Sequence, residues 1–114
     1  MPDRDDELFA LAEAYFAASN AHDLDRIAAM FAPDAVYRSS GVGAHDGPAA
    51  IRAMNETFFA ANPDVAWEVT GRRMVPEDGV ELDFVIALGG KRHKGTERVY
   101  FDKSGLIRKV EVVR

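Results

Sequence analysis

Hydrophobic and polar residues alternate along the second half of the chain. Val80, Leu82, Phe84, Ile86 and Leu88 occupy every second position of one run, with charged or small residues between them. A period of two is typical of a strand with one buried face. Similar runs, separated by turns that contain glycine, predict four strands, over residues 65–75, 80–88, 91–101 and 107–113.

The first half of the chain follows the helical period instead. Leu8, Ala12 and Tyr15 recur three or four residues apart and predict a helix over residues 5–20. A second helix is predicted over residues 24–31, and a third begins at Pro48 and ends before the Asn62-Pro63-Asp64 stop signal.

The remaining segments connect these helices. Asp23 has the side chain to cap the second helix, and Pro33 is expected to close it. Residues 35–38 predict a short strand, and the glycine-rich residues 39–47 predict an irregular loop.

This order of elements predicts one domain, over residues 1–114, of the α+β class. We expect a cone-shaped fold in which three N-terminal helices pack on a curved, mainly antiparallel sheet. The order is α-α-β-α-β-β-β-β, and the wide end of the cone is the expected pocket.

Composition removes several kinds of function. The 114 residues include no cysteine, which excludes thiolate metal sites and cysteine nucleophiles, and the net charge of -5 argues against nucleic acid as a partner. Three histidines are scattered without a carboxylate cluster, so we expect no metal site. No long apolar segment predicts a membrane span, and residues 3–7 are too acidic for a secretory signal, so we expect a soluble, cytoplasmic protein.

Four short stretches occur in an order that covers nearly the whole chain: residues 15–25 (YFAASNAHDLD), 30–37 (MFAPDAVY), 47–51 (GPAAI) and 101–107 (FDKSGLI). Together they resemble the nuclear transport factor 2-like superfamily, and within it the SnoaL-like and ketosteroid-isomerase-like proteins. The resemblance implies a small apolar molecule bearing a carbonyl or hydroxyl group as partner, no cofactor, and a homodimer formed through the outer face of the sheet. It leaves the activity open, because the superfamily contains isomerases, cyclases, hydrolases, dehydratases and proteins without catalysis.

The resemblance to ketosteroid isomerases also implies roles for individual residues. Their two hydrogen-bond donors to the developing oxyanion fall by position on Tyr15 and Glu97, the second being Glu where the family has Asp. Their general base falls on Ser39, whose hydroxyl cannot take a proton at neutral pH without a base of its own. The isomerase activity therefore does not carry over to this chain.

Strand parity places Glu97 on the same face as His93, which we expect nearer the pocket mouth as a candidate base. The alternative for His93 is a hairpin residue beside two lysines. The alternative for Glu97 is an ion pair on a solvated strand with one of three arginines, Arg72, Arg73 or Arg98. Tyr15 alone has the alternative of a core tyrosine with a satisfied hydroxyl.

The candidate lining of the pocket is mostly apolar and consists of Met54, Phe58, Trp67, Val99 and Ser39. Such stripes also occur in ordinary cores. The His45-Asp46 pair could act at the pocket rim, although Asp46 or Gly47 as a helix cap explains it better, and we interpret His22-Asp23 as capping.

Two functions follow from these residues. The first is a small-molecule enzyme, an isomerase or lyase in which Tyr15 and Glu97 stabilise negative charge. The second is a noncatalytic ligand-binding or dimerisation module of the same fold.

Overall fold

The computed structural model describes residues 3–113, so Met1, Pro2 and Arg114, which the predicted domain of residues 1–114 includes, lie outside the described residues. The elements follow one another as α1 (Arg4–Asn20), α2 (Leu24–Ala29), β1 (Phe31–Ser39), β2 (Gly43–Asp46), α3 (Pro48–Ala61), β3 (Ala66–Val75), β4 (Gly79–Leu88), β5 (Lys91–Phe101) and β6 (Ile107–Val113).

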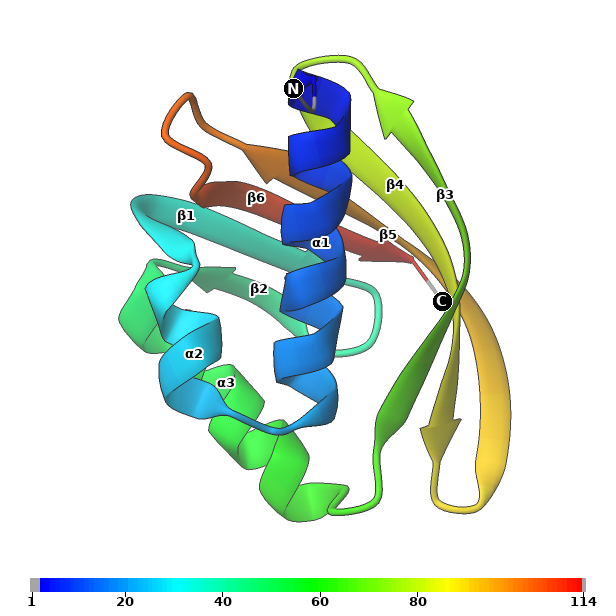
Figure 1. Cartoon of the computed structure of the whole chain (residues 1–114). Helices are drawn as coiled ribbons and strands as arrows, with labels where there is room; N and C mark the ends of the chain where they lie inside the picture. The colour runs from blue at the N-terminus through cyan, green and yellow to red at the C-terminus, as the bar shows by residue number, and fades with distance from the viewer. Residues whose placement is uncertain (1–2, 114) are drawn as a thin grey trace.

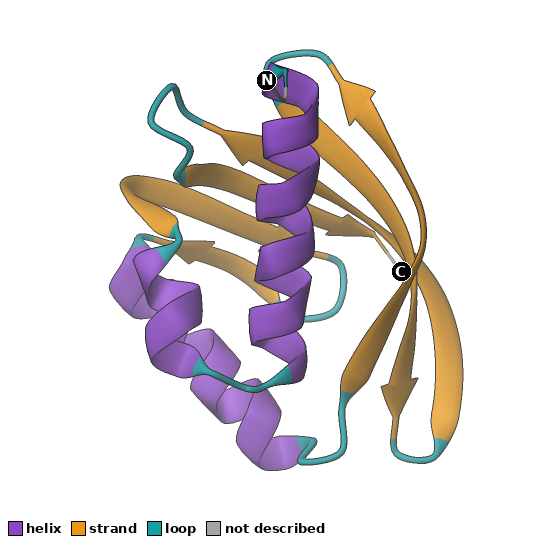
Figure 2. Ribbon diagram, viewed as in Figure 1, coloured by secondary structure: helices purple, strands orange, loops and turns teal. Residues whose placement is uncertain are grey.

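The strands form one six-stranded sheet in the order β2-β1-β6-β5-β4-β3. β1 runs parallel to β6, and the other neighbouring strands of the described residues pair antiparallel. The sheet is strongly curved, and all three helices lie on its concave side (Figure 1, Figure 2). This arrangement confirms the predicted α+β class with a curved, mainly antiparallel sheet.

The segment before α3 differs from the prediction. The expected loop over residues 39–47 contains β2, which pairs with β1 so that Tyr37 lies opposite His45 and Ser39 opposite Gly43. Gly43 adopts φ 84°, a left-handed conformation that suits glycine and turns the chain between the two strands. Pairing with β1 therefore imposes a strand on a segment whose composition favours a loop.

The start of β1 also differs from the prediction. The second helix ends at Ala29, not at residue 31, and the short strand expected over residues 35–38 begins at Phe31. Phe31 lies opposite Ile107 of β6, and the Ile107 backbone N–H donates to the Met30 carbonyl at 2.8 Å. Hydrogen bonding to β6 thus draws these residues out of the helix before Pro33 is reached.

The core lies between α1 and the inner face of the sheet. The alternation predicted for β4 is present, since Val80, Leu82, Phe84 and Ile86 are buried while the residues between them are partly exposed. α1 contributes a buried stripe to the same core: Leu8, Ala12, Tyr15, Phe16 and Ala18.

Charged pairs cover the opposite, outer face of the sheet. Glu81 on β4 accepts hydrogen bonds from Arg73 of β3 and Arg98 of β5, each at 2.7 Å. Asp83 on the same strand pairs with Arg73 and accepts from the Thr96 hydroxyl at 3.2 Å. The outer face of the central strands is therefore a ladder of opposite charges.

Two side chains at the end of α1 and just after it attach the helical layer to β3 and to the residue before it. The Asn20 amide makes two hydrogen bonds to the Trp67 backbone, accepting from its N–H at 2.7 Å and donating to its carbonyl at 2.9 Å. His22 donates from Nε2 to the Val65 carbonyl at 2.9 Å, and its ring stacks on Phe59 with centroids 4.3 Å apart. Of the predicted capping pair, Asp23 does cap α2, accepting from the Arg26 N–H at 3.1 Å, whereas His22 does not.

Within residues 3–113, none of the helices combines the length and the apolar character that crossing a lipid bilayer demands.

Replacing Asn20 tests whether its amide holds α1 to β3. We expect Asn20→Ala to lower the free energy of unfolding by about 1–2 kcal/mol, because both hydrogen bonds to Trp67 are lost. Asn20→Asp retains the acceptor for the Trp67 N–H and should lose less. Urea denaturation measures both variants, and equal losses would contradict a two-bond attachment.

Candidate functional site

A small cavity lies between the inner face of the sheet and α3. Its volume is about 30 Å³, room for one or two water-sized groups. Its lining comes from α3, from the turn before β2 and from the strands β1, β3, β4, β5 and β6.

The cavity contacts most of the predicted lining residues. Ser39, Met54, Phe58 and Trp67 surround it, while Val99 is fully buried elsewhere in the core. Glu97, which was predicted as a site residue, also lines the cavity. Six further lining residues were not predicted from the sequence: Tyr37, Val42, Asn55, Phe84, Ile86 and Val112.

Glu97 supplies the ionisable group of this cavity on β5. Its side chain is only 5% exposed, and the Oε2 atom has no hydrogen-bond partner among the described residues. Burial in these apolar surroundings raises the pKa of the carboxyl group to about 8. The group is therefore largely protonated at neutral pH and able to donate a hydrogen bond.

The three arginines that could have paired with Glu97 are engaged elsewhere. Arg72 pairs with Glu13, Arg98 pairs with Glu81, and Arg73 bridges Glu81 and Asp83. The alternative interpretation of Glu97 as part of a solvated ion pair is therefore wrong.

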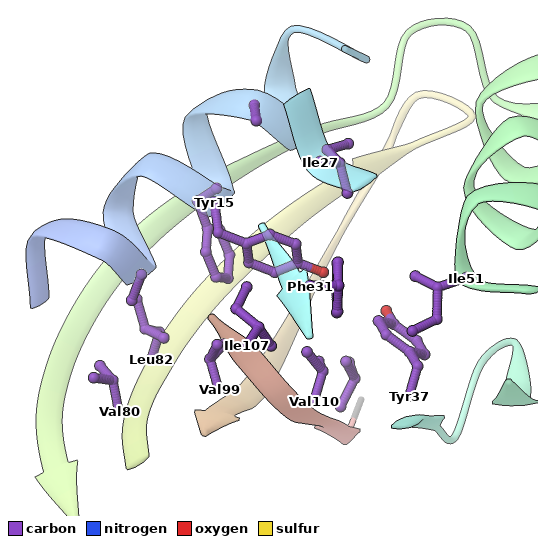
Figure 3. Packing of buried hydrophobic residues seen from close by; sticks show 14 of the residues in the cluster. Tyr15, Ile27, Phe31, Tyr37, Ile51, Val80, Leu82, Val99, Ile107 and Val110 are labelled. Carbon is purple, nitrogen blue, oxygen red and sulfur yellow. The ribbon is translucent and has the colours of Figure 1, made fainter. Parts of the chain in front are cut away.

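Tyr15 is buried on the α1 side of the same interior. Its ring meets those of Phe16 and Phe31 edge to face, with centroids 5.9 and 5.7 Å apart. The pKa of the Tyr15 hydroxyl is raised well above its usual value. Burial is the largest cause, and the negative charge that Glu97 can carry is the second. Tyr15 thus lies within electrostatic range of Glu97, but it does not line the cavity. Figure 3 shows the hydroxyl oxygens of Tyr15 and Tyr37 both directed into the packed interior.

Neither His93, the candidate base, nor Ser39, which occupies the position of the general base of ketosteroid isomerases, is placed to remove a proton in this cavity. The Ser39 hydroxyl accepts from the backbone N–H groups of Gly41 and Val42, at 3.0 and 3.3 Å, and so holds the turn between β1 and β2. His93 is exposed near the end of the β4–β5 hairpin and lines a separate surface hollow with Ser40 and Leu88.

His45 lies at the edge of a second hollow, a surface groove of about 620 Å³ along α3. Its Nε2 donates to the Val42 carbonyl at 2.8 Å. The helix-cap alternative holds for Gly47, the N-cap of α3, while Asp46 pairs with Arg38 at 2.7 Å.

Asn55 is the polar lining residue that our reading of the sequence missed. It is 9% exposed, and its Nδ2 atom has no hydrogen-bond partner among the described residues. The signal was an amide in an apolar stripe, since Ile51, Asn55 and Phe59 follow one another at intervals of four on α3 and are all buried. In residues 3–113 no group of three or more His, Cys, Asp or Glu side chains is arranged to hold a metal ion.

Comparison with known proteins identifies relatives of this fold. Residues 12–106 match the family model described as a SnoaL-like domain. No curated protein matches the sequence.

Three solved structures show the same architecture. An uncharacterised cystatin-fold protein from Novosphingobium aromaticivorans has a TM-score of 0.83 and 20% identity, with 95% of this chain and 97% of that chain covered. A proposed ketosteroid isomerase from Kribbella flavida has a TM-score of 0.81 and 22% identity, over 94% and 76%. A proposed polyketide cyclase from Sinorhizobium meliloti has a TM-score of 0.80 and 24% identity, over 90% and 93%. At these identities the likeness establishes the fold.

The buried carboxyl group predicts a distinctive pH dependence of stability. Between the ordinary pKa of 4.5 and about 8, the folded state holds a proton on Glu97 that the unfolded state releases. The contribution of this group to stability is therefore fully present below about pH 4.5 and is lost as the pH rises toward 8, by at most about 1.4 kcal/mol per pH unit.

We expect Glu97→Gln to lack this loss, so that its stability relative to the wild type increases from about pH 5 to pH 8. Chemical denaturation across this range measures the difference. Glu56→Gln, a substitution of an exposed glutamate beside Asn55, is the control and should show no such trend. A parallel pH dependence for all three proteins would mean that Glu97 titrates as an ordinary carboxyl group.

Proposed function

The chain belongs to the SnoaL-like domain family, and we propose that it binds a small uncharged molecule at the cavity beside Glu97, as an isomerase or lyase that needs no cofactor. The observation that carries the proposal is a buried carboxyl group that lines a cavity and has one oxygen atom, Oε2, without a hydrogen-bond partner among the described residues. A buried polar group without a partner costs stability, so its retention favours a role in recognising a ligand.

The chemistry of a neutral carboxyl group suggests what the ligand offers. A protonated Glu97 can donate to a carbonyl or hydroxyl oxygen and can stabilise negative charge that develops there. The names of two structural neighbours, a proposed ketosteroid isomerase and a proposed polyketide cyclase, both refer to compounds that contain ketone groups. We assign the hydrogen bond to the ligand oxygen to Glu97. Tyr15 is buried within electrostatic range of Glu97 but does not line the cavity, so we assign it no contact with the ligand.

A second candidate is ligand binding without catalysis. Among the described lining residues, Ser39 has no base beside it, and Glu97 is protonated where a base would need to be ionised. These observations support the second candidate, whereas the buried donor on Glu97 supports the first. Exchange of the acidic C–H protons of a bound ketone in D₂O, followed by NMR, distinguishes the two functions, because a binding protein leaves the buffer rate unchanged.

The homodimer through the outer face of the sheet stays a prediction. The charged ladder around Glu81 is the surface that such a dimer would cover. Light scattering coupled to gel filtration measures the molar mass in solution and so distinguishes a dimer from a monomer.

Titration with 1-indanone, a compact apolar ketone, tests ligand binding at Glu97. We expect backbone amide shifts at cavity residues and an affinity at least about tenfold lower for Glu97→Leu, which removes the donor at similar volume. Glu81→Leu makes the same change on the outer face and should leave the affinity unaltered. Equal affinity of the wild type and Glu97→Leu would refute the proposed site.

A further inference from the structure

Two buried side-chain atoms in the described residues have no hydrogen-bond partner, Asn55 Nδ2 and Glu97 Oε2. They come from different layers of the fold, one from α3 and the other from β5. Both residues line the same cavity of about 30 Å³. The convergence of two unpaired polar groups on one small space indicates a site for a single polar atom.

The cavity is continuous in its lining with the groove along α3. Val42, Met54 and Phe58 contribute to both. The groove has a volume of about 620 Å³, and the α3 residues that line it are mostly small or apolar, including Ala50, Ala53 and Ala61. A ligand could therefore place a polar tip in the cavity while its body lies in the groove.

We infer that Asn55 and Glu97 together bind one carbonyl oxygen, and that the α3 groove holds the apolar body to which this carbonyl is attached. This inference rests on the proposed function and adds the substrate class and the second donor. By family resemblance the second donor would be Tyr15, but the structure brings Asn55, not Tyr15, to the cavity wall.

A carbonyl oxygen fits these two groups better than other oxygen groups do. The Asn55 Nδ2 atom can only donate, and the O–H of a neutral carboxyl group is a stronger donor than its C=O is an acceptor. A carbonyl oxygen has two lone pairs and no proton, so it accepts from both. A hydroxyl group brings a proton that needs an acceptor, and a carboxylate brings a charge into an apolar space.

Three probes with the same bicyclic body separate these possibilities: 1-indanone, 1-indanol and indane. We expect the wild-type protein to bind 1-indanone roughly tenfold more tightly than either of the others, because only the ketone satisfies both donors. In ¹⁵N-labelled protein, 1-indanone should shift the side-chain NH₂ resonances of Asn55, and indane should leave them nearly unchanged.

Asn55→Leu tests the second donor at similar volume. We expect the preference for 1-indanone over indane to fall by about tenfold while the melting temperature of the free protein rises, since an unpaired buried amide is removed. The matched control is Glu56→Leu, which introduces the same side chain at the next position of α3, where the residue is exposed and lines neither the cavity nor the groove. Glu56→Leu should keep the wild-type preference and leave the melting temperature nearly unchanged.

The inference is overturned if the wild type binds the three probes equally, if it binds 1-indanol as tightly as the ketone, or if Asn55→Leu keeps the wild-type preference. In those cases binding that depends on Glu97 still supports the proposed function. If none of the probes binds, both the inference and the proposed function fail.

Discussion

Burial of one carboxyl group in an apolar interior is the constraint around which this structure is arranged. Glu97 lies on the inner face of β5, next to the fully buried Val99, and the strand presents its neighbour Arg98 to the opposite side. The sheet separates charge accordingly, because the arginines pair with Glu81 and Asp83 outside and leave Glu97 neutral inside. A charged partner on the inner face would lower the pKa of this group and remove its ability to donate.

Much of the fold could be predicted because local pattern and tertiary structure agree. The strict alternation in β4 and the helical spacing in α1 correspond to their buried faces in the structure. β2 could not be predicted, because Gly41, Gly43 and Gly47 favour a loop and only pairing with β1 makes a strand of the residues between them. The same dependence on distant pairing places Phe31 in β1, opposite Ile107, instead of in the preceding helix.

The site shows a similar division. The position of Glu97 in the cavity follows from strand parity and family spacing, since both use relations along one strand. Asn55 was missed because an amide within a helical stripe has no meaning until the opposite wall is known, and that wall comes from strands far along the chain. His22 was interpreted as a capping residue, but in the structure it connects the helices to the residue before β3. Its ring donates to the Val65 carbonyl and stacks on Phe59.

The parallel pairing of β1 with β6 has a consequence for how the protein is made. Among the six described strands, β1 leaves the ribosome first and β6 last, yet they lie side by side and Ser39 is opposite Val112, both on the cavity wall. Contacts between such distant segments carry a large entropic cost of loop closure and tend to form late. The nascent chain can therefore assemble its helices and the β3–β4–β5 meander early, but the pocket is completed only when synthesis has reached the final strand.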